Sequence, residues 1–150
     1  MAEWIAPIFD RTQSDVDFAI SKIAEWKNTG STNMYDLKGC LNTSDINRIE
    51  GDIRYLADNL SKLYYYSNIT TRTWDTLGLP DVEDISRIIQ NVAKIISAYH
   101  QTSTAPKLPE TMLTYTDIND LEQNLFLIKA ILDNMITLFR ECNTFECGEV

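Results

Sequence analysis

The chain has 150 residues, 44% of them apolar, and a net charge of −9, a composition typical of one globular domain with a sizeable core. No apolar run reaches the roughly 18 residues of a membrane-spanning helix. Residues 1–7 also lack the basic and apolar regions of a signal peptide, so we expect synthesis in a cytosol and no membrane insertion. The negative charge argues against nucleic-acid binding, which depends on neutralising phosphates.

Two helices are predicted in the first half of the chain. The first spans residues 14–27, with Ser14 as its N-cap. The second spans residues 44–66, with Ser44 as its N-cap. Its apolar residues follow a 3-4-3-4-3 spacing, which is typical of helices that pack in coiled-coil fashion.

Two further helices are predicted in the second half, over residues 82–99 and over residues 116–142, the last with Thr116 as its N-cap. The connections between the helices are longer than ordinary bundle turns, so we expect them to bind a partner or to wrap the bundle. The periodic apolar positions predict a core that includes Ile49, Ile53, Leu56, Leu60, Leu121, Leu125, Ile128 and Leu132.

An internal repeat links the two halves. Residues 44–53 match residues 116–125, with four of ten positions identical, and residues 15–24 resemble residues 84–93 more weakly. Repetition of this kind predicts architecture more directly than local propensity does. We therefore expect an all-α fold, a single four-helix domain over residues 1–150, built from two related helix–loop–helix halves at approximately residues 14–66 and 82–142.

The repeat carries a polar motif of aspartate, asparagine and glutamate. Its residues are Asp45, Asn47 and Glu50 in the first copy and Asp117, Asn119 and Glu122 in the second. The aspartate favours a helix start, because a negative charge there complements the helix dipole. The asparagine and glutamate lie three residues apart on one helix face and would share a structural role, such as bonding the preceding loop. The alternative, a duplicated ligand or metal site, lacks further ligands.

Catalytic and metal-binding patterns are missing from the sequence. There is no glycine-rich phosphate loop, and one histidine, His100, makes a Ser/His/Asp or Cys/His arrangement improbable. We expect His100 at a helix end, packed or exposed to solvent. An odd number of cysteines argues against a disulfide framework, and Cys142 and Cys147 lack the paired spacing that zinc requires. We therefore expect no enzyme, no metal and no cofactor.

Aromatic residues outside the main helix seams suggest a partner surface. Three consecutive tyrosines cannot all face one core, and two tryptophans lie outside the predicted helices. Tyrosine and tryptophan are favoured at protein interfaces, although packing beneath the long loops is the alternative. The candidate partner-binding residues are Trp4, Tyr64, Tyr65, Tyr66 and Trp74.

Several segments resemble phage tail and baseplate-associated proteins of Gram-positive hosts. The resemblance rests on residues 4–12, with their Asp-Arg-Thr motif, and on residues 41–50, with Asn-Arg-Ile-Glu. It continues through smaller matches at Asp15-Val16, Tyr55-Leu56, Trp74, Leu79-Pro80, Arg87-Ile88, Asn91-Val92 and residues 119–122. In such proteins a helical segment of this kind is often one module of a longer virion protein.

The resemblance implies a non-enzymatic virion structural protein, part of a tail or baseplate. It would be made in the cytoplasm of a bacterial host, and its partners would be other virion proteins or further copies of itself. The alternative is a small acidic phage-encoded inhibitor of a host defence protein. Residues 73–150 carry 5 Lys/Arg against 12 Asp/Glu, so a decoy for a basic groove fits the same charge.

Overall fold

The computed structural model describes residues 2–30, 37–75, 78 and 80–144, and for residues 139–144 only the backbone. It confirms the all-α fold with four helices, and the described residues form no strand. The helices are α1 (Gln13–Thr29), α2 (Thr43–Ser61), α3 (Val82–Ala98) and α4 (Tyr115–Thr144).

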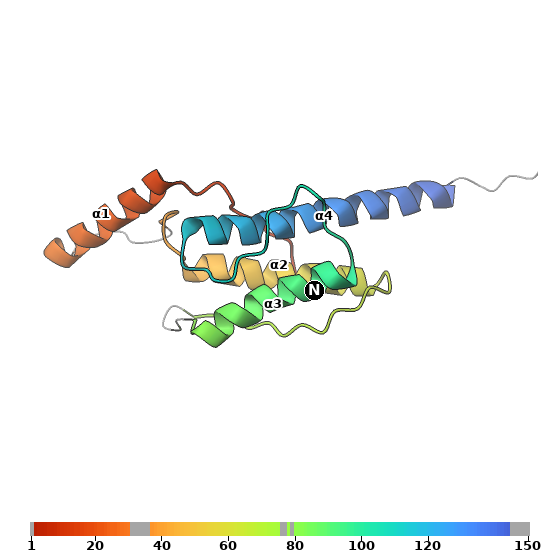
Figure 1. Ribbon diagram of the computed structural model, residues 1–150, viewed down its shortest axis with the longest axis horizontal. Coiled ribbons are helices and arrows are strands. Elements are labelled where there is room, and N and C mark those ends of the chain that lie inside the picture. The colour runs from red at the N-terminus through yellow and green to blue at the C-terminus, as the bar shows by residue number, and fades with distance from the viewer. Residues whose placement is uncertain (1, 31–36, 76–77, 79, 145–150) are drawn as a thin grey trace, which may run out of the picture.

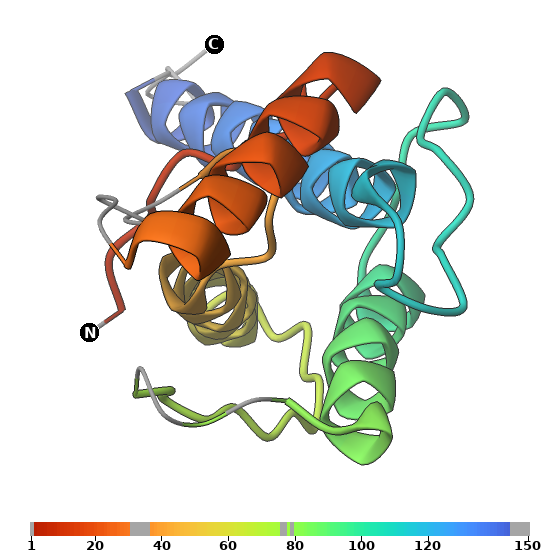
Figure 2. The same cartoon turned by 90° about the vertical axis from the view of Figure 1, so that its left-hand side faces the viewer.

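Helices α2, α3 and α4 form the bundle, and each of them packs against the other two. They run in the same direction, as the colours of Figure 1 show. Seen from the end, the three helices stand at the corners of a triangle (Figure 2). Helix α1 lies across the N-terminal end of this bundle and buries only Ala19. The bundle therefore has three parallel members, and α1 is an appendage to it.

The core consists of apolar residues at matching positions of the three bundle helices. All eight core residues predicted from the helical periodicity are fully buried, which confirms that prediction. Helix α3 contributes its own series, which is buried at the same four positions. Counted from the aspartates in the first turns, the buried series are Ile49, Ile53, Leu56 and Leu60 in α2, Ile88, Val92 and Ile95 in α3 with Tyr99 at its C-cap, and Leu121, Leu125, Ile128 and Leu132 in α4.

The predicted N-caps are each two residues too late. Thr12 is the N-cap of α1 and Asn42 is the N-cap of α2, not Ser14 and Ser44. At α4, the Asp117 amide donates to the Thr114 hydroxyl over 3.2 Å, so Thr114 takes the role predicted for Thr116. The aspartates belong to the third helical position, where each carboxylate accepts from the backbone of the cap in a capping box.

The second helix is shorter than predicted, because α2 ends at Ser61 and not at residue 66. Lys62 is its C-cap, and Tyr64 follows with a backbone φ of +67°. A left-handed residue cannot continue a right-handed helix, so the chain turns away at this point. The three tyrosines therefore lie in the turn and the segment after α2.

Two helix–loop–helix halves are not shown. The weak similarity between residues 15–24 and 84–93 predicted that α1 corresponds to α3. However, α1 lies outside the bundle, while α3 shares the buried series of α2 and α4. The sequences of the three bundle helices align from their first-turn aspartates, Asp45, Asp84 and Asp117. The structural repeat consequently occurs three times, once in each bundle helix.

Candidate functional site

Three irregular segments lie along the bundle, and we call them straps. The first strap is residues 2–12, the second is residues 66–75 and the third is residues 101–113. The second and third straps return the chain to the N-terminal end of the bundle, where the next helix begins (Figure 1). Most of the polar motif residues contact these straps.

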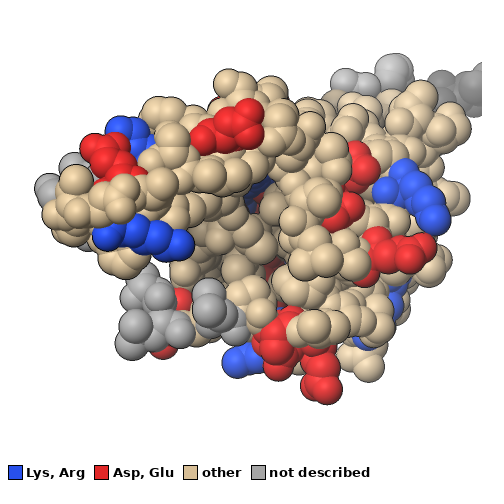
Figure 3. Space-filling model, turned by 60° about the vertical axis from the view of Figure 1, so that its left-hand side comes forward, with Lys and Arg blue, Asp and Glu red and all other residues tan. Residues whose placement is uncertain are grey.

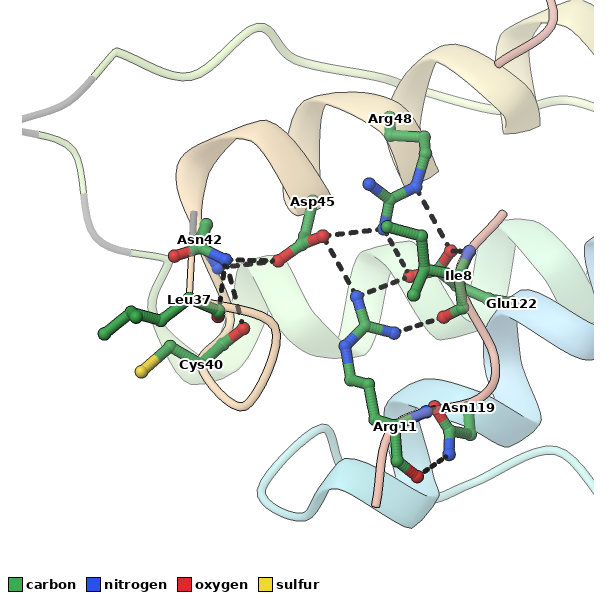
Figure 4. Close-up of polar contacts among 9 residues, drawn as sticks. All are labelled: Ile8, Arg11, Leu37, Cys40, Asn42, Asp45, Arg48, Asn119 and Glu122. Atoms are coloured by element: carbon green, nitrogen blue, oxygen red, sulfur yellow. Dashed lines mark hydrogen bonds and ion pairs between the residues drawn. The ribbon is translucent and has the colours of Figure 1, made fainter. Parts of the chain in front are cut away.

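The deepest polar cluster joins α2, α4 and the first strap (Figure 4). Arg48 of α2 bonds Asp45 and Glu122, each over 2.7 Å, and Arg11 of the strap reaches the same two carboxylates over 3.0 and 3.1 Å. All four side chains are at least 90% buried. Two guanidinium groups and two carboxylates cancel in charge, which reduces the cost of burying them.

The same cluster fixes the backbone of the first strap. Oδ1 of Asn119 accepts from the Arg11 amide over 3.2 Å, and its Nδ2 donates to the Arg11 carbonyl over 2.9 Å. The Ile8 amide donates to Glu122, and the Arg11 guanidinium donates to the Ile8 carbonyl. Asn119 and Glu122 of the second copy thus bond the N-terminal segment, which is 108 residues away in sequence from Asn119. Asp117 of the same copy bonds Thr114 in the loop before α4.

The first copy of the motif repeats this arrangement on the second strap. Oδ1 of Asn47 accepts from the Trp74 amide over 2.8 Å, and its Nδ2 donates to the Trp74 carbonyl over 2.9 Å. Glu50 accepts from Arg87 of α3 over 2.7 Å and from the Trp74 indole over 3.4 Å. Arg87 also contacts Asp84, the first-turn aspartate of α3, over 3.3 Å.

These contacts follow the order of a three-fold rotation. In each set, the arginine stands three residues after the first-turn aspartate of one helix and pairs with a glutamate of the next helix. An asparagine on the same helix as that glutamate holds a strap. Two of the three sets are complete. The two complete pairs are Arg48 with Glu122 and Arg87 with Glu50. In the third set, Asp120 stands at the arginine position and Ile89 at the glutamate position. The third set lacks both the arginine and the glutamate, and Ser86 stands at the position of its asparagine.

A second polar position, seven residues after each first-turn aspartate, also holds a strap. Nδ2 of Asn91 donates to the Thr70 carbonyl over 2.8 Å, and Nδ2 of Asn124 donates to the Pro106 carbonyl over 3.0 Å. Asp52 occupies the same position in α2, where its Oδ1 accepts from the Ile5 amide over 3.0 Å. Within the described part of the chain its buried Oδ2 has no hydrogen-bond partner.

The electrostatics of Asp52 differ from those of the paired network. Burial raises the pKa of Asp52 to about 7, and the charge of Glu122 adds to the effect, while the Ile5 amide and Arg48 oppose it. Burial alone would lower the pKa of Arg48, but hydrogen bonds to Glu122 and Asp45 raise it. The arginine therefore stays charged at all ordinary pH values, whereas Asp52 can change its protonation near neutrality.

The five aromatic candidates divide into two groups. Tyr64 and Tyr66 are 82% and 69% exposed, so they are available to a partner. The prediction for Trp74 as a partner-binding residue is wrong, because its side chain is buried and belongs to the core. The Arg72 guanidinium carbon lies over the ring, 4.6 Å from its centroid. Tyr65 packs edge-on against Tyr99 with centroids 4.9 Å apart.

Trp4, the remaining aromatic candidate, is half-buried in the first strap. Its ring centroid lies 5.6 Å from that of Tyr55, and the Lys129 ammonium is 5.5 Å from its centre. The ring fastens the beginning of the strap to α2 and α4, which leaves only part of it open to solvent.

The arginines are the residues that the motif search missed. Arg11 and Arg72 each precede a threonine in a strap, and each reaches the first-turn aspartate of a helix, Asp45 or Asp84. Arg48 and Arg87 each follow such an aspartate by three residues. The recurring Asp-x-x-Arg and Arg-Thr pairs were therefore the available signals, and they pointed to α3 as a relative of α2.

Other candidate groups form no site among the described residues. His100 is exposed beside Tyr99, at the end of α3 as expected. Cys40 is half-buried and its pKa is raised by burial. The Cys142 side chain and Cys147 lie outside the described part. In that part we find no group of three or more residues suited to a metal and no helix apolar and long enough to cross a membrane.

Comparison with known proteins gives no relative. No protein-family model, curated protein or solved structure matches the chain.

Proposed function

We propose that the protein is a non-enzymatic structural component of a phage virion, in its tail or baseplate. The observation that supports this best is the use of the repeated polar residues. The polar groups of these residues bond straps and helices to one another, in Asn47, Asn119, Glu50 and Glu122. Such a network suits a module that holds its shape within an assembly.

Two further features support the proposal. The sequence resembles phage tail and baseplate-associated proteins over most of its length, through motifs that include the buried residues Arg11 and Arg48. Large apolar side chains are also exposed on α1, where Phe18, Ile20 and Trp26 are 45–60% accessible. Surfaces of this kind are suited to contacts with neighbouring subunits.

The proposal is tested by interrupting the coding sequence in the phage that carries it. We expect electron microscopy to show particles with incomplete or missing tails, and complementation with the wild-type protein should restore normal particles. Complete, infectious particles in the absence of the protein would contradict the proposal. Complete particles that fail only on hosts with an intact defence system would favour an inhibitor.

A further inference from the structure

The third set of the repeat lacks the strap contact that the other two sets make. Asn47 and Asn119 are half-buried beneath the straps they hold. Their counterpart in α3 is Ser86, which is exposed and bonds Gln90 of its own helix over 3.1 Å. A serine side chain is one atom too short to make the paired amide bonds of an asparagine. The third strap is therefore not held to α3 at this point.

A groove with a volume of about 480 Å³ opens at this position. It lies between the first turns of α3 and the end of the third strap, and Ser86 and Glu110 line it together. Its surface is mostly apolar, from Leu41, Pro80, Val82, Ile85, Met112 and Leu113. The groove thus lies where the strap contact is missing.

The rim of the groove exposes apolar side chains to an unusual degree. Val82 is 85% exposed and Leu113 is 87% exposed, although both line the groove together with the buried core residue Met112. At such exposure each side chain buries little apolar surface within the isolated chain. Departures from an otherwise consistent pattern are expected where a protein meets its function.

The groove is also acidic at its edges. Asp81 and Glu110 line it, and Glu83 is exposed in the first turn of α3 next to Val82. The Glu110 carboxylate lies 3.7 Å from Lys107, with both side chains 88% exposed, so solvent screens this pair strongly. Figure 3 brings this end of the molecule forward and shows uncharged side chains over much of it, with acidic groups at several places around the face, one of them at the lower edge.

We propose that this groove is a docking site for one amphipathic segment of a neighbouring virion protein. The segment presents an apolar side chain to the groove between Val82 and Leu113 and carries lysine or arginine on either side of it. Burial of the exposed apolar surface provides affinity, and the acidic rim selects and orients a basic partner. This inference rests on the proposed function and names the chemistry of the partner.

Two groove variants and one control test the proposal by incorporation into particles. The first variant is Val82→Ser with Leu113→Ser, the second is Glu83→Lys with Glu110→Lys, and the control is Asp58→Lys on the exposed side of α2. We expect each groove variant to lower incorporation roughly tenfold. The control should incorporate like the wild type. Thermal unfolding of the purified proteins checks that all variants keep the wild-type fold.

The outcomes separate this inference from the proposed function. If the wild type enters particles and the folded groove variants enter equally well, the docking site is refuted and the virion role stands. If the wild type is absent from particles, the virion role fails and this inference fails with it.

A photo-crosslinking amino acid in place of Leu113 identifies what lies in the groove. In intact particles we expect crosslinks to a segment of another virion protein that contains apolar and basic residues. Crosslinks only to a second copy of this chain, or to an acidic segment, would overturn the proposal.

Discussion

At the scale of single residues, Asp52 should make the stability of the protein depend on pH. Its pKa is raised from 3.8 to about 7, so between these values the folded state holds a proton that the unfolded chain has lost. The free energy of unfolding therefore falls as pH rises through this window, and the loss is complete above about pH 7. Asn91 and Asn124 show that a neutral amide serves at this position.

We predict that Asp52→Asn raises the free energy of unfolding by about 2–4 kcal/mol at pH 8 and changes it little at pH 4. Urea denaturation at the two pH values measures this. Asp58→Asn, an exposed change on the same helix, should have no such pH dependence. An equal effect of Asp52→Asn at both pH values would show that Asp52 is already charged in the folded protein at pH 4.

Of the two buried glutamates of the motif, Glu122 should contribute more to the free energy of unfolding. It neutralises Arg11 and Arg48 and is itself fully buried. We predict that Glu122→Gln lowers the free energy of unfolding by about 3–5 kcal/mol, because two buried cations then share one carboxylate. Glu50→Gln should cost less, since Arg87 is 21% exposed and keeps Asp84 as a partner. Equal losses in urea denaturation would contradict this ranking.

At the scale of secondary-structure elements, each asparagine should control one strap. Asn119→Ala removes two bonds to the first strap, and Asn47→Ala removes two bonds to the second. Each change should lower the free energy of unfolding by about 1–3 kcal/mol, since a backbone amide and a carbonyl of the strap lose their partners. Hydrogen exchange followed by mass spectrometry should show faster exchange in residues 8–12 for the first variant and in residues 70–75 for the second. Faster exchange throughout the bundle in both would mean that the straps do not move independently.

The sequence predicted the bundle helices and their core well, because apolar periodicity is a local property of each helix. It placed the end of α2 five residues too late, since Leu63 continues the apolar spacing. No glycine or asparagine at position 64 indicated the left-handed backbone that Tyr64 adopts. The three-fold relation was hidden because α3 lacks the asparagine and glutamate of the motif, with Ser86 and Ile89 in their place. The partners of Arg11 could not be predicted, because they lie on two helices far along the chain.

At the scale of the whole molecule, the three bundle helices form a common core around one axis, and the straps run along the outside of the bundle. Truncation of a residue on that axis should therefore affect the entire domain. We predict a loss of about 2–5 kcal/mol for Leu125→Ala, which is fully buried, against less than about 0.5 kcal/mol for Leu138→Ala, which is 60% exposed. Comparable losses in thermal or urea unfolding would show that the core is misassigned.

The virion role is tested most directly by quantitative mass spectrometry of particles purified on a density gradient. A structural component is present in a fixed number of copies per particle, because the symmetry of the assembly sets its stoichiometry. We therefore predict that the ratio of this protein to the major capsid protein is constant across independent preparations and across gradient fractions. Absence from purified particles, or a ratio that falls with each purification step, would contradict the account.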